Sequence, residues 1–232
     1  MHDRRYDLVF SLGAACSCTE SLRAAGLQHL SFPFDWLYGS DIRGRTELLI
    51  GGFADWLRPE LMVEEERPAW NPDAIYVNRK TGISFNHDFP CDVPFADAFP
   101  RVVERYRRRI DRLMALIRGA KRVLAVWVNI PTEPPVDDAE VIRCRERLQA
   151  RFPEVEFDLL CFQPVDGLDV AKDVALADGV RKVSFDFGFH GPKDYAWKVD
   201  VPKLLPWLAD YSVRDYRTLW ERLFGAFRKR RA

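Results

Sequence analysis

Short apolar runs alternate along the chain with segments whose apolar residues recur at helical spacing. Four of the runs are typical of buried strands, and they lie at residues 7–12, 122–130, 156–162 and 182–187. Helical spacing is clearest at residues 99–119, and it returns at 137–152. This order predicts an α/β fold with a mostly parallel sheet and helices on both of its faces, in three layers.

The first strand breaks at a glycine and leads directly into a helix. The run at 7–12 ends at Gly13, and residues 14–23 predict a helix that closes at Gly26. A strand that turns at a glycine into a helix is the usual opening unit of an α/β protein. We therefore expect the turn after Gly13 to lie at the carboxyl end of a buried strand.

The chain from about residue 31 to 98 departs from this alternation, and we interpret it as an insertion after the first strand–helix unit. It is rich in aromatic residues and contains a short predicted helix at 42–50. Two apolar stretches, 74–78 and 82–86, predict a β-hairpin.

No linker or change in composition divides the chain, so we expect a single domain over residues 1–232. Its last part, about residues 201–231, is rich in tryptophan and predicted to be largely helical.

The charges balance, with 35 Lys and Arg against 35 Asp and Glu in 232 residues. This balance argues against a generally basic nucleic-acid-binding protein and against a disordered acidic chain. No apolar run approaches the roughly 20 residues of a membrane span, and none near the start is long enough for a signal peptide. Five cysteines are too few for a disulfide scaffold. We expect a soluble, cytoplasmic protein with reduced thiols and no membrane or nucleic-acid partner.

Candidate chemistry gathers where the predicted strands end, because sites of open parallel sheets lie beyond the carboxyl ends of the strands. Cys16 follows Gly13 at the start of the first helix, where the helix dipole and free amides favour a thiolate and can hold an oxyanion. Asn129 lies at the end of the second strand. A small thiol that packs the helix against the sheet is the alternative interpretation of Cys16.

A nucleophilic cysteine needs a base, and the chain contains only four histidines. His87 precedes Asp88 at the end of a predicted strand, and His190 lies in a glycine-flanked loop near Asp194. Both are candidate bases, and an ordinary structural histidine is the alternative for each.

The sequence predicts neither a metal site nor a cofactor. Cys16 and Cys18 face different ways on a helix, and no further ligand stands at zinc spacing. The glycine-rich motifs of nucleotide-binding proteins are absent from the sequence.

Asp35 and Trp36 lie in an aromatic stretch of the insertion and are candidates for a substrate-binding wall, with Asp35 as a polar contact. The alternative is a loop that its aromatic side chains pin to the core.

Five blocks of sequence carry a resemblance to a known family: Ser11-Leu12-Gly13-Ala14-Ala15-Cys16, Leu22-Arg23-x-x-Gly26-Leu27, Pro33-Phe34-Asp35-Trp36-Leu37, Phe85-x-His87-Asp88-Phe89 and Gly191-x-x-Asp194-x-Ala196-Trp197-Lys198. In this order they look like the bacterial family described as putative papain-like cysteine peptidases, a domain of unknown function. The resemblance implies a cysteine nucleophile and a histidine base, which correspond to Cys16 and His87. Asp88 is the nearest acidic residue for orienting the base, but adjacent strand residues point to opposite faces. Asn129 or Asp194 are the alternatives.

The predicted parallel sheet differs from a papain-like fold, in which the cysteine lies in a helical half and the histidine on an antiparallel sheet. The first block also looks like that of GDSL-type hydrolases. However, Ala15 stands where that family keeps its serine, and the late Asp-x-x-His block is missing. We use this second likeness as a fold-level analogy only.

Two functional hypotheses follow. The first is a cysteine-dependent hydrolase or acyl-transfer enzyme acting on a peptide or another acyl substrate, with Cys16, His87 and Asp88 as catalytic residues. Gly13, Asp35, Trp36, Asn129, His190 and Asp194 are the candidate substrate-binding residues. The second is a non-catalytic α/β domain that binds a carbohydrate or peptide and in which Cys16 is structural.

Overall fold

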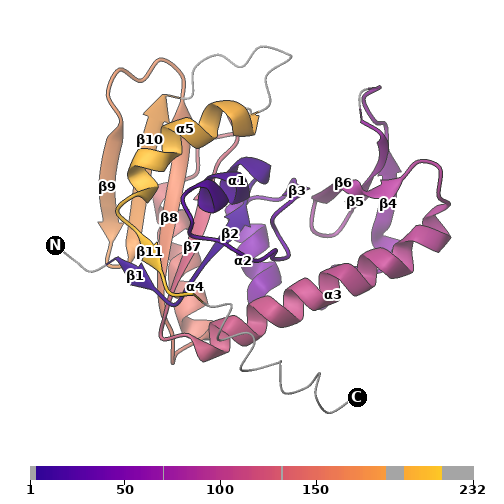
Figure 1. The fold of residues 1–232 in the computed structure, drawn as a ribbon, viewed down its shortest axis with the longest axis horizontal. Coiled ribbons are helices and arrows are strands. Elements are labelled where there is room, and N and C mark those ends of the chain that lie inside the picture. Colours follow the sequence, from indigo (N-terminus) through magenta and orange to yellow (C-terminus); the bar gives the residue numbers. More distant parts are fainter. Residues whose placement is uncertain (1–3, 70, 132, 187–195, 216–232) are drawn as a thin grey trace.

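The structure is a computed structural model of the 232-residue chain, and it describes residues 4–69, 71–131, 133–186 and 196–215. Its central sheet has five strands in the order β2-β7-β8-β10-β9 (Figure 1). The strands β2, β7, β8 and β10 run parallel, and β9 pairs antiparallel with β10 at the edge. The bounds are β2 Leu8–Gly13, β7 Arg122–Val128, β8 Glu156–Val165, β9 Lys172–Ala177 and β10 Val180–Asp186. All four strands predicted from the apolar runs are confirmed.

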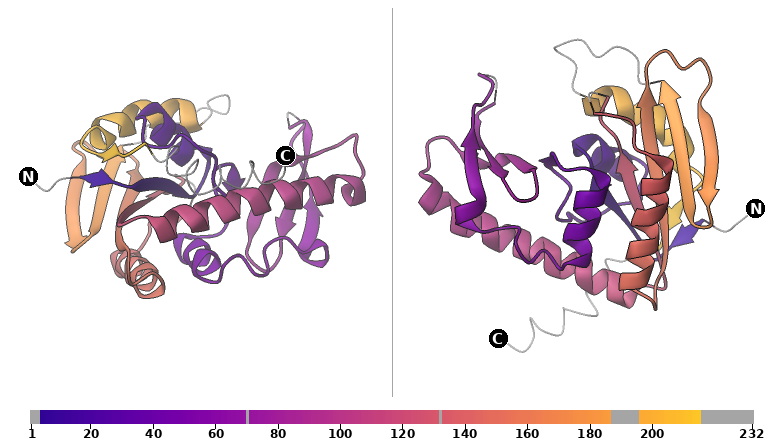
Figure 2. Two further views of the ribbon diagram at one scale, coloured as in Figure 1. Left: turned by 60° about the horizontal axis from the view of Figure 1, so that its bottom comes forward. Right: turned by 180° about the vertical axis from the view of Figure 1, so that it is seen from behind.

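Each face of the central sheet packs against helices, because successive side chains of its strands alternate between the two faces. Val9, Leu124 and Val126 belong to one apolar cluster, which also contains residues of α1 and α5. Phe10 and Trp127 belong to the other, with residues of α2, α3 and α4. Figure 2 shows the helices on both sides of the strands. The bounds are α1 Cys16–Ala24, α2 Ile42–Ile50, α3 Phe95–Gly119, α4 Asp138–Arg151 and α5 Ala196–Leu208.

The insertion forms a second, wholly antiparallel sheet in the order β3-β6-β5-β4. Its strands are β3 Leu37–Tyr38, β4 Met62–Glu65, β5 Asp73–Asn78 and β6 Ile83–Pro90, and a short 3-10 helix, η1 Pro59–Leu61, precedes β4. The predicted hairpin is β5 and β6. Aromatic rings fill its core: Trp56 lies 5.8 Å from Phe85 and 5.0 Å from Tyr106 of α3, between ring centroids. The long helix α3 spans from this sheet to the central one (Figure 1).

The described chain therefore has an α/β fold, but the expectation of a mostly parallel sheet needs correction. The insertion contributes only antiparallel pairs, and β9 adds another, so the sheets are mixed. Of the predicted C-terminal helical segment, about residues 201–231, only the part up to residue 215 lies within the described residues. The helix α5 ends at Leu208, and β11 (Ser212–Val213) follows and pairs in parallel with β1 (Arg5–Tyr6). None of the described helices combines the length and the apolar character that crossing a membrane requires.

Candidate active site at the Cys16 turn

Cys16 is the first residue of α1, where β2 turns into the helix. The strand ends at Gly13, whose φ of +130° is a conformation that glycine adopts readily and other residues avoid. The N–H of Ala14 donates to the carbonyl of Val128 at 2.9 Å, which ties the turn to the end of β7. Ala15 is extended and precedes the first helical turn. The turn therefore presents a partly exposed cysteine beyond the carboxyl ends of two parallel strands.

The Cys16 sulfur has opposing influences on its protonation. Burial raises its pKa above the ordinary cysteine value, and Glu20 acts in the same direction. The Tyr38 hydroxyl and the backbone N–H groups of Cys16 and Ser17 hydrogen-bond the sulfur and partly offset this rise. The sequence-based expectation that the helix terminus favours a thiolate is thus outweighed by desolvation. Cys16 is a neutral thiol at pH 7, and a base has to remove its proton before it can attack.

The other four cysteines occupy different surroundings. Burial raises the pKa of Cys18 to about 12, of Cys144 to about 11 and of Cys161 to about 12. Cys91 is exposed just after β6, and all five thiols are free. Cys18 donates from its sulfur to the carbonyl of Val126 at 3.3 Å, so it packs α1 against the sheet. Within the described residues, no three potential metal ligands come together.

His87 lies in an irregular part of β6. On its two sides Phe85 pairs with Tyr76 and Phe89 pairs with Ala74 of β5, so three residues of β6, 86–88, lie opposite a single residue of β5. Such bulges bend a strand and redirect its side chains, and they are frequent beside active sites. His87 is exposed, whereas the next residue is buried.

Asp88 lies beneath this bulge and contacts α3. Its Oδ1 accepts a hydrogen bond from Arg105 at 2.7 Å, and its Oδ2 accepts one from the Tyr106 hydroxyl at 2.7 Å. Both carboxylate oxygens therefore have partners on the helix, and Asp88 anchors β6 to α3.

The elements that carry Cys16 and His87 meet through Tyr38. The Tyr38 hydroxyl and the Cys16 thiol influence each other's pKa, and the Tyr38 strand β3 pairs directly with β6, with Tyr38 opposite Ser84. His87 is three residues farther along β6. The groups that influence the Cys16 pKa are Tyr38, Glu20 and the nearby backbone amides, and His87 is not one of them.

A pocket of about 580 Å³ opens beside the Cys16 turn. Ala14 and Gly39 line one part of it, and Trp127 and Asn129, at the end of β7, line another. Asn129 is buried, and its Nδ2 donates to the carbonyl of Pro134 at 2.9 Å. The rest of the wall combines uncharged residues, several of them apolar, with four acidic residues, Asp41, Glu133, Asp137 and Glu140.

Asp35 is fully buried and bonds to residues of the segment that follows α1. Its carboxylate accepts hydrogen bonds from the backbone N–H of Phe32 at 2.8 Å and from Nε2 of Gln28 at 2.9 Å. Burial raises its pKa to about 6 despite these donors. Trp36 is partly exposed, and the Arg23 guanidinium lies 5.2 Å from its ring centroid. This geometry agrees with a loop pinned to the core, and Asp35 has no exposed surface to offer a ligand.

Two residues near Cys16 are absent from the sequence-based candidates, Tyr38 and Arg45. Arg45 is fully buried in α2, and its guanidinium donates to backbone carbonyls on both sides of Gly13. The sequence does contain a signal that Arg45 is buried, because its helical spacing places it with Ile42 and Leu49 on the apolar side of a short helix. Tyr38 lies within an aromatic stretch and carries no comparable signal.

His190 and Asp194 lie outside the described residues. The helix α5, which follows this stretch, brings a buried carboxyl group to the start of α1. Asp200 receives a hydrogen bond from Ser17, and burial raises its pKa to about 6.

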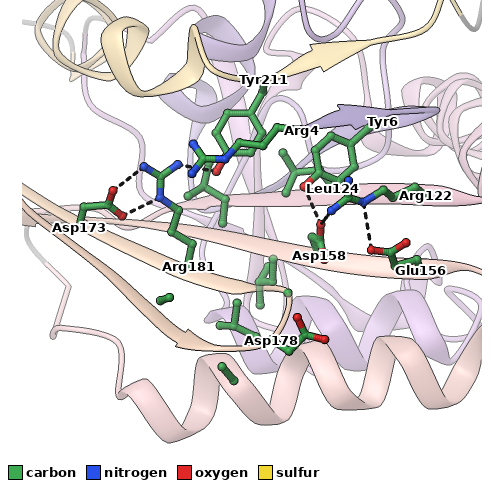
Figure 3. A pocket seen from close by; sticks show the side chains of 16 residues that line it. Arg4, Tyr6, Arg122, Leu124, Glu156, Asp158, Asp173, Asp178, Arg181 and Tyr211 are labelled. Atoms are coloured by element: carbon green, nitrogen blue, oxygen red, sulfur yellow. Dashed lines mark hydrogen bonds and ion pairs between the residues drawn. The ribbon is translucent and has the colours of Figure 1, made fainter. Parts of the chain in front are cut away.

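A larger cavity of about 700 Å³ lies at the opposite, amino-terminal edge of the parallel strands (Figure 3). Arg122 pairs there with Asp158 at 2.9 Å, and Arg181 pairs with Asp173. These two ion pairs join charged groups of its own lining, and none of the predicted site residues lines it. We therefore place the candidate site at the Cys16 turn.

The comparisons with known proteins gave a match to one family model. Residues 7–163 match the family described as "Putative papain-like cysteine peptidase (DUF1796)". Curated proteins and solved structures gave no match. The family match covers more than half of the chain and includes Cys16, Tyr38, Arg45 and His87. The chain therefore belongs to this family of putative papain-like cysteine peptidases.

Proposed function

We propose that the protein is a cysteine-dependent hydrolase or acyl-transfer enzyme in which Cys16 is the nucleophile and His87 the base. The observation that carries the proposal is the setting of Cys16. Among the five cysteines, it alone combines partial exposure with a position at the first turn of a helix, where backbone N–H groups reach its sulfur. The family membership supports the same residue type as nucleophile.

The proposed reaction needs a proton acceptor because Cys16 is a neutral thiol. His87 takes the thiol proton while the sulfur attacks the carbonyl carbon of an acyl substrate. The N–H groups of Cys16 and Ser17 donate to the oxyanion that forms. The imidazolium then returns the proton to the leaving group, the carbon–leaving-group bond breaks, and a thioester remains. Water, deprotonated by the same imidazole, hydrolyses the thioester and regenerates the thiol.

The pocket beside Ala14 is the proposed place for the acyl substrate, a peptide or a related molecule. It begins two residues from Cys16, and Asn129 lies in its wall. Asn129 is also a better candidate than Asp88 for contacting a substrate there, because Asn129 lines the pocket whereas Asp88 does not and is bonded to α3 through both carboxylate oxygens.

A thiol-directed acyl probe tests the proposal. We expect the probe to label Cys16 faster than the exposed Cys91 below pH 8, with the sites identified by mass spectrometry. His87→Ala should abolish this preference, and His190→Ala, the matched variant, should preserve it. The reverse result would assign the base to His190.

Equal labelling of Cys16 and Cys91 in the wild type, unaffected by either histidine variant, would contradict the proposed enzymatic function. That outcome would favour the alternative, a non-catalytic domain that binds a carbohydrate or peptide.

A further inference from the structure

Arg45 bridges the two chain segments that meet at the Cys16 sulfur. On the first segment its Nη1 donates to the Leu12 carbonyl at 3.2 Å, and its Nη2 donates to the Ala14 carbonyl at 2.8 Å. On the second, Nη2 donates to the Leu37 and Gly39 carbonyls, each at 2.9 Å. The first pair of carbonyls flanks Gly13, just before Cys16, and the second pair flanks Tyr38.

The guanidinium of Arg45 is fully buried and enclosed by its neighbours. A Cβ at Gly13 would lie 2.1 Å from Nη1, so the absence of a side chain there makes room for the group. The rings of Phe34 and Trp127 cover it, with centroids 5.6 Å and 5.8 Å from its central carbon. A planar guanidinium presents its donors in a rigid fork. One buried side chain therefore joins the two carbonyl pairs.

We propose that Arg45 is a positioning residue that sets the approach of the Tyr38 hydroxyl to the Cys16 sulfur. The Tyr38 hydroxyl lowers the pKa of the Cys16 thiol and so favours the charged form, which is the state that attacks. The inference rests on the proposed function for its catalytic meaning, whereas the contact itself is testable without a substrate.

The experiment measures the rate at which iodoacetamide alkylates Cys16 of the folded full-length protein as a function of pH, with Cys91 as the internal reference. Tyr38→Phe should slow alkylation of Cys16 at pH 7 by about tenfold and move its profile to higher pH, because a hydrogen bond to the thiolate is lost. Arg45→Lys keeps the charge but not the fork, and it should shift the profile in the same direction. In the Arg45→Lys background, Tyr38→Phe should cause little further shift in the pH profile of Cys16 alkylation.

Arg43→Lys is the matched control, since Arg43 lies on the same helix but is exposed. It should leave the profile unchanged. The proposal is overturned if Arg45→Lys lowers stability to urea but leaves both the Cys16 profile and the Tyr38→Phe effect as in the wild type, because Arg45 is then only structural. An unchanged profile in Tyr38→Phe alone also overturns it, even where Arg45→Lys does not fold.

These results are distinguishable from failure of the proposed function. The alkylation profile reports the Cys16–Tyr38 contact, whereas the acyl probe and the histidine variants report catalysis.

Discussion

At the scale of single residues, the region around Cys16 contains two buried ionisable groups whose partners are mostly uncharged. Burial lowers the pKa of Arg45 to about 10, and its hydrogen-bond acceptors are backbone carbonyls. Asp35 is likewise buried, and its nearest donors are an amide side chain and a backbone N–H. Such groups are costly to bury and strongly constrain the backbone that satisfies them. Their effect on stability should therefore be measurable at single positions.

Gly13→Ala should destabilise the fold by about 3 kcal/mol. The alanine would be held at a positive φ that is unfavourable for it, and its Cβ would also meet the Arg45 guanidinium. Gly52→Ala is the control. Gly52 also has a positive φ, of +66°, but a Cβ there meets nothing within 4 Å, so about 1 kcal/mol is expected. Urea unfolding measures both. Equal losses would show that the Arg45 contact contributes nothing.

The ionisation of Asp35 should make the stability depend on pH. Its pKa is about 6 in the fold and near 3.8 in the unfolded chain, so the folded protein binds the proton more tightly. The free energy of unfolding should therefore fall as the pH rises from about 4 to 6, by roughly 2–3 kcal/mol, and then level off. Asp35→Asn cannot titrate and should lack this part of the decline. Urea unfolding between pH 4 and pH 7 compares the two proteins, and a constant difference over that range would contradict the expectation.

At the scale of elements, Asp88 joins the inserted sheet to α3. Asp88→Ala should cost about 2–3 kcal/mol, because the buried Tyr106 hydroxyl and the Arg105 guanidinium both lose their acceptor. Tyr106→Phe removes one of the two bonds and leaves the ion pair, so about 1 kcal/mol is expected. Chemical denaturation distinguishes them. If Asp88→Ala lowered the free energy of unfolding no more than Tyr106→Phe does, the ion pair with Arg105 would make no net contribution to stability.

The elements with strong periodic patterns were predictable from the sequence, and the remainder depend on tertiary context. The predicted helix at 42–50 has the observed bounds, and the apolar run at 156–162 lies within β8. The edge strand β9 is mostly exposed, so its sequence lacks the apolar alternation of a half-buried strand. β3 has only two residues, and its pairing with β6 gives no local signal.

The same distinction applies to the candidate site. Gly13 and Cys16 are neighbours in sequence, so the strand–glycine–helix pattern located their turn. Tyr38 and Arg45 reach the turn from other elements, through a hydroxyl contact and a set of carbonyl bonds. Contacts between distant segments leave no periodic trace. Only the occurrence of an arginine on an apolar helix face hinted at one of them.

At the scale of the whole molecule, the first and last described strands close the fold at the edge of the central sheet opposite Cys16. β1 and β11 pair there in parallel, and the rings of Tyr6 and Tyr211 stack with centroids 6.1 Å apart. The Tyr6 hydroxyl donates to Asp158 of β8 at 2.6 Å, and Arg181 of β10 donates to the Tyr211 hydroxyl at 2.8 Å (Figure 3). Two tyrosines thus connect both ends of the described chain to the sheet.

Tyr211→Ala should therefore loosen both ends together. A loss of about 3 kcal/mol is expected because a mostly buried ring and its hydrogen bond disappear, whereas Tyr211→Phe keeps the ring and should lose about 1 kcal/mol. Hydrogen exchange locates the effect: the N–H groups of Ser212 and Arg214, which donate to the Arg4 and Tyr6 carbonyls, should exchange faster in Tyr211→Ala. The alkylation profile of Cys16 should not change, because the tyrosine pair lies at the other end of the parallel strands. Unchanged exchange at these two amides would show that strand pairing, and not the tyrosine stack, holds the ends together.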